Sequence, residues 1–155
     1  MHFIRALSLA TALIAASAGA QPFAGGDIVV DHPWARATPK GAAVGVGYFT
    51  LRNNGHAADV LTGIRSEAAG AVQMHESKMD GGVMRMDEIA SLAIPPGGSV
   101  TFKPGGNHAM FIDLKAPFTK GGHFTATLNF EHAGKIAVDF TIEGVGAAAP
   151  GMEMK

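Results

Sequence analysis

Residues 123–143 read HFTATLNFEHAGKIAVDFTIE and contain two runs in which apolar and polar side chains alternate. The runs are His123–Glu131 and Lys135–Glu143, and the short link between them ends in Gly134. Alternation places the apolar side chains on one face of a strand, and a short glycine-containing link is typical of antiparallel neighbours. This stretch therefore predicts two paired strands that turn one face toward a core.

The same pattern extends over the chain from Asp27 to Glu143. Further strands are predicted at Ile28–Val30, Gly45–Asn53, Asp59–Ser66, Ala71–Ser77, Val83–Ile89, Ser99–Lys103 and His108–Leu114. Clusters of glycine, proline and asparagine separate these runs, and no window shows a sustained helical period. Many short strands without intervening helices predict an all-β fold, an antiparallel sandwich or barrel.

The chain has 155 residues, which is enough for one domain with its own core. Residues 1–20 carry Arg5, an apolar run and the sequence Ala18-Gly19-Ala20, a pattern typical of a cleaved signal peptide. The apolar run is shorter than the roughly 20 residues that span a bilayer. We therefore expect a signal peptide at 1–20, a β-sandwich domain at 21–143 and a flexible tail at 144–155.

Charge and cysteine content exclude several functional classes. A formal net charge of −1 gives no electrostatic reason for binding nucleic acid or an anionic membrane. The absence of cysteine excludes disulfides, thiolate metal sites, cysteine nucleophiles and a lipidated cysteine anchor. Since no catalytic constellation is recognisable either, we expect a protein that is not an enzyme. Eight methionines and seven histidines remain as the notable reactive groups.

Residues 74–89, MHESKMDGGVMRMDEI, predict a hairpin that is rich in possible ligands. If Asp80-Gly81 is a two-residue loop, His75 lies opposite Met86 and Ser77 lies opposite Met84. Directly opposed side chains have Cβ atoms roughly 4.5–5.5 Å apart, which suits two ligands of one ion. A longer loop would make His75 and Met86 diagonal neighbours.

The predicted strand His108–Leu114 supplies a second pair of candidate ligands. His108 and Met110 are two residues apart and therefore point to the same face of the strand. We expect Ile112 and Leu114 to continue this face into the apolar core, so that the pair lies where a core strand emerges.

Two imidazoles and two thioethers form a soft, neutral ligand set. Thioethers favour Cu(I), whereas Zn²⁺ prefers thiolate, imidazole and carboxylate, and Ca²⁺ prefers oxygen. A blue-copper centre requires a cysteine thiolate, which this chain lacks. The candidate metal ligands are His75, Met86, His108 and Met110, and the candidate metal is Cu(I), one ion per chain.

The spacing His75-x₁₀-Met86-x₂₁-His108-x-Met110 resembles the signature of the PCu(A)C family of periplasmic copper chaperones. The stretches at residues 32–38, 48–53, 82–86 and 104–110 agree with that family, and the resemblance covers Asp27 to Glu143. It implies a cupredoxin-like Greek-key sandwich that binds Cu(I) at an exposed site through the four residues named. It also implies a periplasmic location and copper delivery to the dinuclear centre of cytochrome c oxidase subunit II, often together with a Sco-type thiol protein.

Other functions remain open from the sequence alone. A copper buffer or resistance protein would use the same ligands without a dedicated acceptor. A redox enzyme or electron carrier on a cupredoxin-like fold is disfavoured by the missing cysteine. Met152 and Met154 in the tail could bind additional copper weakly. We expect a monomer without stable membrane insertion.

Overall fold

The computed structural model describes residues 22–151, and within this range every regular element is a β-strand. The strands are β1 (Phe23–Gly25), β2 (Ile28–Arg36), β3 (Val44–Asn53), β4 (Asp59–Arg65), β5 (Ala69–Asp80), β6 (Val83–Ile89), β7 (Leu92–Ile94), β8 (Ser99–Thr101), β9 (His108–Leu114), β10 (His123–Phe130) and β11 (Gly134–Glu143). The predicted signal peptide and the methionines Met152 and Met154 lie outside the described residues. Among residues 22–151 no helix has the length and hydrophobicity needed to cross a bilayer.

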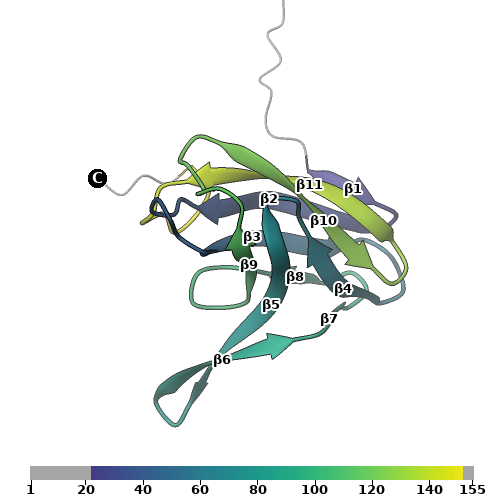
Figure 1. Ribbon diagram of the computed structural model, residues 1–155. Helices are drawn as coiled ribbons and strands as arrows, with labels where there is room; N and C mark the ends of the chain where they lie inside the picture. Colours follow the sequence, from purple (N-terminus) through teal and green to yellow (C-terminus); the bar gives the residue numbers. More distant parts are fainter. Residues whose placement is uncertain (1–21, 152–155) are drawn as a thin grey trace, which may run out of the picture.

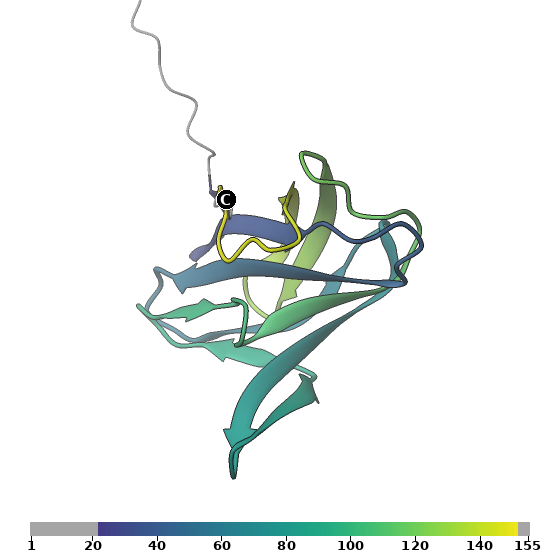
Figure 2. The ribbon, with the colours of Figure 1, turned by 90° about the vertical axis from the view of Figure 1, so that its left-hand side faces the viewer.

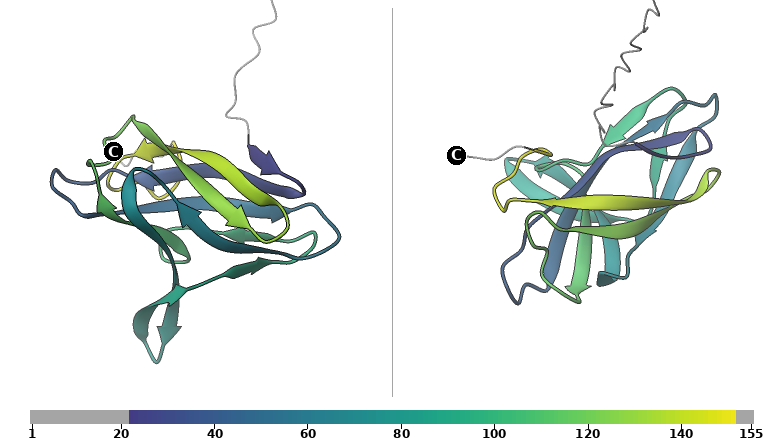
Figure 3. Two further views of the ribbon diagram at one scale, coloured as in Figure 1. Left: turned by 45° about the vertical axis from the view of Figure 1, so that its right-hand side comes forward. Right: turned by 90° about the horizontal axis from the view of Figure 1, so that it is seen from above.

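The strands form one curled sheet in the order β6-β5-β9-β3-β2-β11-β10-β4-β7, with β1 beside β2 and β8 beside β3. All pairings between named strands are antiparallel except that between β11 and β2, which is parallel. The sheet folds over itself, so that β4, β10 and β11 cover the inner face of β3, β5 and β9 (Figures 1 and 3). The predicted all-β sandwich is confirmed, and the parallel pair is the one departure from an antiparallel arrangement.

Most of the predicted strands are present, but two short ones were missed, and β2 and β5 are longer than expected. β1 and β7 have only three residues each, too few to show an alternating pattern. β2 does not end at Val30 but continues to Arg36 across an irregularity in its pairing with β3. His32 lies in this irregularity with a φ of 49°, and the following Pro33 cannot donate a ladder hydrogen bond.

Aromatic rings fill the space between the two halves of the sheet. Phe111 of β9 is fully buried and meets the rings of Phe118, Phe124 and Phe140 edge-on, with centroids 5.8, 5.0 and 5.7 Å away. Gly47 of β3 leaves room for this cluster, because a Cβ there would lie 2.8 Å from the Phe111 ring. The core therefore fixes the position of β9, and with it the residues on the outer face of that strand.

Asp59 at the start of β4 holds the β10–β11 turn. Its carboxylate accepts hydrogen bonds from the backbone N–H groups of His132 and Ala133, each at 2.9 Å, and from that of Val60 at 2.7 Å. Burial raises the pKa of Asp59, but these three N–H donors outweigh it and bring the pKa below its usual value.

The β5–β6 hairpin projects from one end of the sandwich, and Figures 1 and 2 show it standing clear of the other strands. Every residue of β6 before Ile89 is exposed, and so are the last three residues of β5. The hairpin therefore owes its shape to its own ladder and turn rather than to burial.

Candidate metal centre

His75 and His108 are direct neighbours across the β5–β9 ladder. Their rings stack with centroids 5.5 Å apart and planes inclined by 26°. His108 is buried to 7% exposure, while His75 is partly exposed. The fold thus brings together two imidazoles that are far apart in the sequence.

Each ring uses one nitrogen in a hydrogen bond and leaves the other available. His108 Nδ1 donates to the carbonyl oxygen of Gly106 at 3.1 Å, so that Nε2 carries the free lone pair. His75 Nε2 lies 3.0 Å from Gln73 Oε1, a carbonyl acceptor, so that Nδ1 is the free nitrogen. Hydrogen bonds of this kind orient metal-binding imidazoles and fix their tautomers.

Met110 occupies the same outer face two rows further along β9, where a row means residues directly opposite one another on neighbouring strands. It lies opposite Gln73 of β5 and Val46 of β3 and is partly buried. The expectation that Ile112 continues this face into the core is wrong, although Leu114, which follows Asp113 with its φ of 59°, packs against the core. The core face of β9 is formed by Ala109 and Phe111, both fully buried, so His108 and Met110 lie on the outside of the sheet.

The predicted hairpin register also needs correction. The turn residues are Gly81 and Gly82, with φ of 57° and 82°, so His75 lies opposite Glu88 and Met86 lies opposite Ser77. Both central positions of a type I′ turn require positive φ, which costs glycine nothing and disfavours an aspartate. The shift leaves the faces unchanged: His75 and Met86 still share a face, but as diagonal neighbours.

Met86 is the one candidate ligand that the structure leaves apart from the others. It lies on β6, which pairs with β5 and not with β9, and its side chain is 62% exposed. On a flat sheet with ordinary strand spacing, Met86 and Met110 would be roughly 16 Å apart. For both thioethers to bind the ion held by the two imidazoles, the hairpin must bend toward β9.

An aromatic cluster continues the outer face beyond His108. The register that pairs Gly47 with Ala109 places Tyr48 of β3 next to His108, and Tyr48 pairs in turn with Trp34 of β2. The Trp34 and Tyr48 rings lie 4.7 Å apart, and both side chains are buried. Burial raises the pKa of the Tyr48 phenol, although the positive charge of Arg36 partly opposes this. Tyr48 therefore borders the histidine pair as a neutral group.

The segment after β11 covers this cluster. Ala147 is 2% exposed against Trp34 and Tyr48, and its carbonyl oxygen accepts a hydrogen bond from Arg36 Nε at 2.9 Å. The start of the segment predicted as a tail is thus packed on the sheet, and the structure describes it as far as Gly151.

Sequence reasoning did not identify Gln73 and Tyr48 as neighbours of the site. Gln73 shares the face of His75 by simple alternation, so its signal was present in the sequence. Tyr48 becomes a neighbour only through the β3–β9 pairing, which no local pattern reveals.

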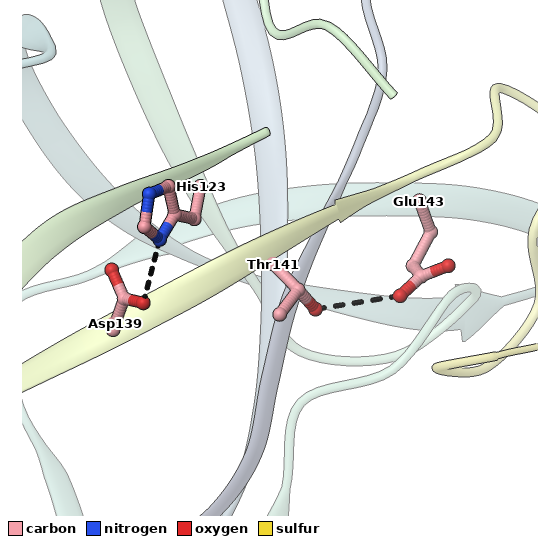
Figure 4. A network of polar contacts seen from close by, with 4 residues as sticks. All are labelled: His123, Asp139, Thr141 and Glu143. Carbon is pink, nitrogen blue, oxygen red and sulfur yellow. Dashed lines mark hydrogen bonds and ion pairs between the residues drawn. The ribbon is translucent and has the colours of Figure 1, made fainter. Parts of the chain in front are cut away.

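His123 lies elsewhere, at the start of β10. Its Nδ1 is 3.0 Å from Asp139 Oδ2, and Figure 4 shows this pair beside the contact between Thr141 and Glu143. The His123 side chain is 72% exposed. Within residues 22–151 no three histidine, cysteine, aspartate or glutamate side chains form a group that could hold a metal ion.

Comparison with known proteins places the chain in a family. The LpqE-like family, described as "Putative lipoprotein LpqE-like", matches residues 28–142. The chain belongs to this family. The LpqE-like chain is 33% identical over 104 residues to "Putative lipoprotein Lxx21020" of Leifsonia xyli, and 32% identical over 104 residues to the uncharacterized protein RP573 of Rickettsia prowazekii. The aligned parts cover 66% and 64% of this chain, and about three fifths of the length of these curated relatives (61% and 58%).

Solved structures give a more specific likeness. The apo PCuAC domain of PmoF2 is 29% identical, with a TM-score of 0.71, and the match covers 83% of this chain and 99% of that domain. The copper-bound form of that domain has a TM-score of 0.70 at 29% identity, covering 80% and 98%. Cu(I)-bound DR1885 from Deinococcus radiodurans has a TM-score of 0.58 at 25% identity, covering 81% and 83%. The LpqE-like chain thus has a cupredoxin-like fold of the PCuAC type, as its motifs predicted.

Proposed function

We propose that the chain is an exported, non-enzymatic copper chaperone that binds one Cu(I) ion through His75, Met86, His108 and Met110. The observation that carries the proposal is the His75–His108 pair, stacked across two strands with one free nitrogen on each ring. Two copper-bound structural neighbours of the PCuAC type support the choice of metal.

The chemistry of the four ligands suits a carrier. Thioethers and imidazoles are neutral ligands, and thioether sulfur favours Cu(I) over Zn²⁺. Because His75 and Met86 are open to solvent, the ligands of an acceptor can reach the ion before those of the donor leave. We expect His75 and His108 to hold the ion and Met86 to join when the hairpin bends.

The proposed setting follows from the family resemblance. The chain would act as a monomer in the periplasm after removal of residues 1–20, without inserting into the membrane or binding nucleic acid. Its acceptor would be the dinuclear copper centre of cytochrome c oxidase subunit II, with a Sco-type protein as a second partner. Met152 and Met154 would add at most a weak site.

Substitution of single ligands tests the metal site. His108→Ala and Met110→Ala should each lower Cu(I) affinity by at least tenfold in competition with a Cu(I) chelator. His123→Ala is the matched control, because it removes an imidazole from the same protein at a remote strand. Equal affinities of all three variants would overturn the assignment. X-ray absorption should count two nitrogen and two sulfur scatterers around copper.

A second experiment separates the chaperone from a copper buffer, the alternative that uses the same ligands. A chaperone should load an apo subunit II fragment or a Sco-type protein faster than an unrelated chelator of equal affinity. A buffer should equilibrate with all of them without selectivity. Transfer without partner preference would therefore favour the buffer.

A further inference from the structure

We propose that the tip of the β5–β6 hairpin carries a second Cu(I) site formed by the thioethers of Met79, Met84 and Met86, with Met86 shared between the two sites. The inference takes Cu(I) as cargo from the proposed function, but two of its three ligands, Met79 and Met84, are not ligands of the proposed site.

The three methionines lie on one face at the projecting end of the hairpin. Met79 and Met84 are directly opposite one another in the last row but one before the turn, and Met86 lies two rows further from the turn, opposite Ser77. Their exposed fractions are 67%, 49% and 62%. The three thioethers are thus accessible to solvent on the projecting end of the hairpin, which does not pack on the core.

The geometry lets the three sulfur atoms converge. Directly opposed residues have Cβ atoms about 4.5–5.5 Å apart, and diagonal neighbours on the same face remain within reach of long side chains. Methionine is unbranched with three rotatable bonds, so its sulfur can adapt to a neighbouring pair. In this register Met86 adjoins Met84 and Met79 on the tip side and His75 on the other.

Burial in the core does not explain why methionine occupies these three positions. Met74, on the opposite face of β5, is buried to 4% and belongs to the core. Met79 and Met86 are mostly exposed and Met84 is half exposed, so each gains less from the hydrophobic effect than a core side chain does. Their common feature is the thioether, a soft ligand that favours Cu(I).

The positively charged side chains of the hairpin lie on the face opposite the methionines. The opposite face of the hairpin carries ion pairs between Lys78 and Glu76 at 2.8 Å and between Arg85 and Asp80 at 3.4 Å. On the methionine face the charged residue of the ladder is Glu88, directly opposite His75. A monovalent cation at the tip therefore meets no lysine or arginine on that face, and it finds a carboxylate beside the histidine pair.

Because Met86 lies between the two ligand sets, it can exchange an ion between them. An ion held by Met79, Met84 and Met86 would keep one sulfur ligand while His75 replaces the others. The tip would then be the place where copper enters or leaves the histidine site, by exchange of neutral ligands and without any change in oxidation state.

The test uses Ag(I), a redox-inert substitute for Cu(I), with the full chain labelled at its methionine methyl groups and its histidine rings. The first equivalent should shift the signals of the His75 and His108 rings and of Met110. Further Ag(I) should shift the methyl signals of Met79 and Met84, with an affinity at least tenfold weaker. Met79→Leu/Met84→Leu should bind one equivalent of Ag(I) fewer by equilibrium dialysis, leave the Met86 methyl signal unresponsive to the second equivalent, and change the first affinity less than twofold.

Two further variants keep the two proposals distinguishable. Met110→Leu removes a thioether outside the tip and should leave the tip response intact. His75→Ala/His108→Ala should lose the first site while the methyl groups of Met79 and Met84 still respond. If the imidazoles of the unaltered chain respond and the Met79 and Met84 methyls do not, the tip site is refuted and the proposed function stands. If the double histidine variant binds the first equivalent as well as the unaltered chain, the proposed function fails instead.

Discussion

The interior of the sandwich and the β5–β6 hairpin are built in opposite ways. The interior contains stacked and edge-on phenylalanine rings from β3, β9, β10 and β11, and most of these side chains are fully buried. The hairpin has almost no buried residue beyond Met74, and its exposed side chains are methionines and paired charges. The first region is stabilised by burial, and the second by its ladder and its two turn glycines.

The candidate ligands lie along the border between these regions. His108 and Met110 occupy the outer face of a strand whose inner face is held by Phe111, whereas Met86 lies on the projecting hairpin. This arrangement combines a half of the site that is held by the core with a half that is held only by the hairpin ladder. It suits a protein that must bind an ion and also release it.

The largest expected effect concerns the interior. Phe111→Ala should lower the free energy of unfolding by about 3–5 kcal/mol, because it leaves a cavity among three other rings. Met84→Ala, the matched truncation on the hairpin, should change it by no more than about 0.5 kcal/mol. Urea denaturation measures both, and similar losses would show that the hairpin contributes to the core after all.

A smaller effect on the free energy of unfolding is expected from substitution of Asp59, whose carboxylate binds backbone N–H groups within the sandwich. Asp59→Asn should cost about 1–3 kcal/mol, because an amide cannot accept all the backbone hydrogen bonds that the carboxylate accepts. The folded-state pKa of Asp59 is depressed, so its contribution is complete above the unfolded pKa of about 3.9 and is lost as the pH falls through the folded value. The stability difference between the two proteins should therefore shrink below about pH 4. A difference independent of pH would contradict the role of the carboxylate.

The smallest effect is expected beside the site itself. Gln73→Ala removes the acceptor for His75 Nε2 and should weaken Cu(I) binding by about tenfold, because the ring is no longer held in one tautomer and orientation. Unfolding should change little, since Gln73 is on the outer face. A chelator competition measures the affinity, with Gln73→Glu as the variant that keeps an acceptor and should restore most of it. No change in Gln73→Ala would show that the contact does not orient His75.

Local patterns predicted well what depends on neighbouring residues. β6 and β9 begin and end where the sequence predicted them, and the faces shared by His75 with Met86 and by His108 with Met110 were correct. The hairpin register was wrong because Asp80-Gly81 and Gly81-Gly82 are both plausible turns, and the choice depends on which residue tolerates positive φ. The prediction of which face of β9 is internal was also wrong, because apolar side chains occur on both sides of that strand.

The sequence by itself determined that this is an all-β chain and where most strands lie, and it supplied four soft side chains as candidate ligands of one metal. These features follow from the two-residue period of a strand and from side-chain chemistry, and both are local properties. Only the tertiary structure decided that His75 lies opposite His108, that Tyr48 borders this pair and that Met86 projects away from it. Strand neighbours are chosen by the burial of whole faces across long sequence separations, and no local pattern encodes that choice.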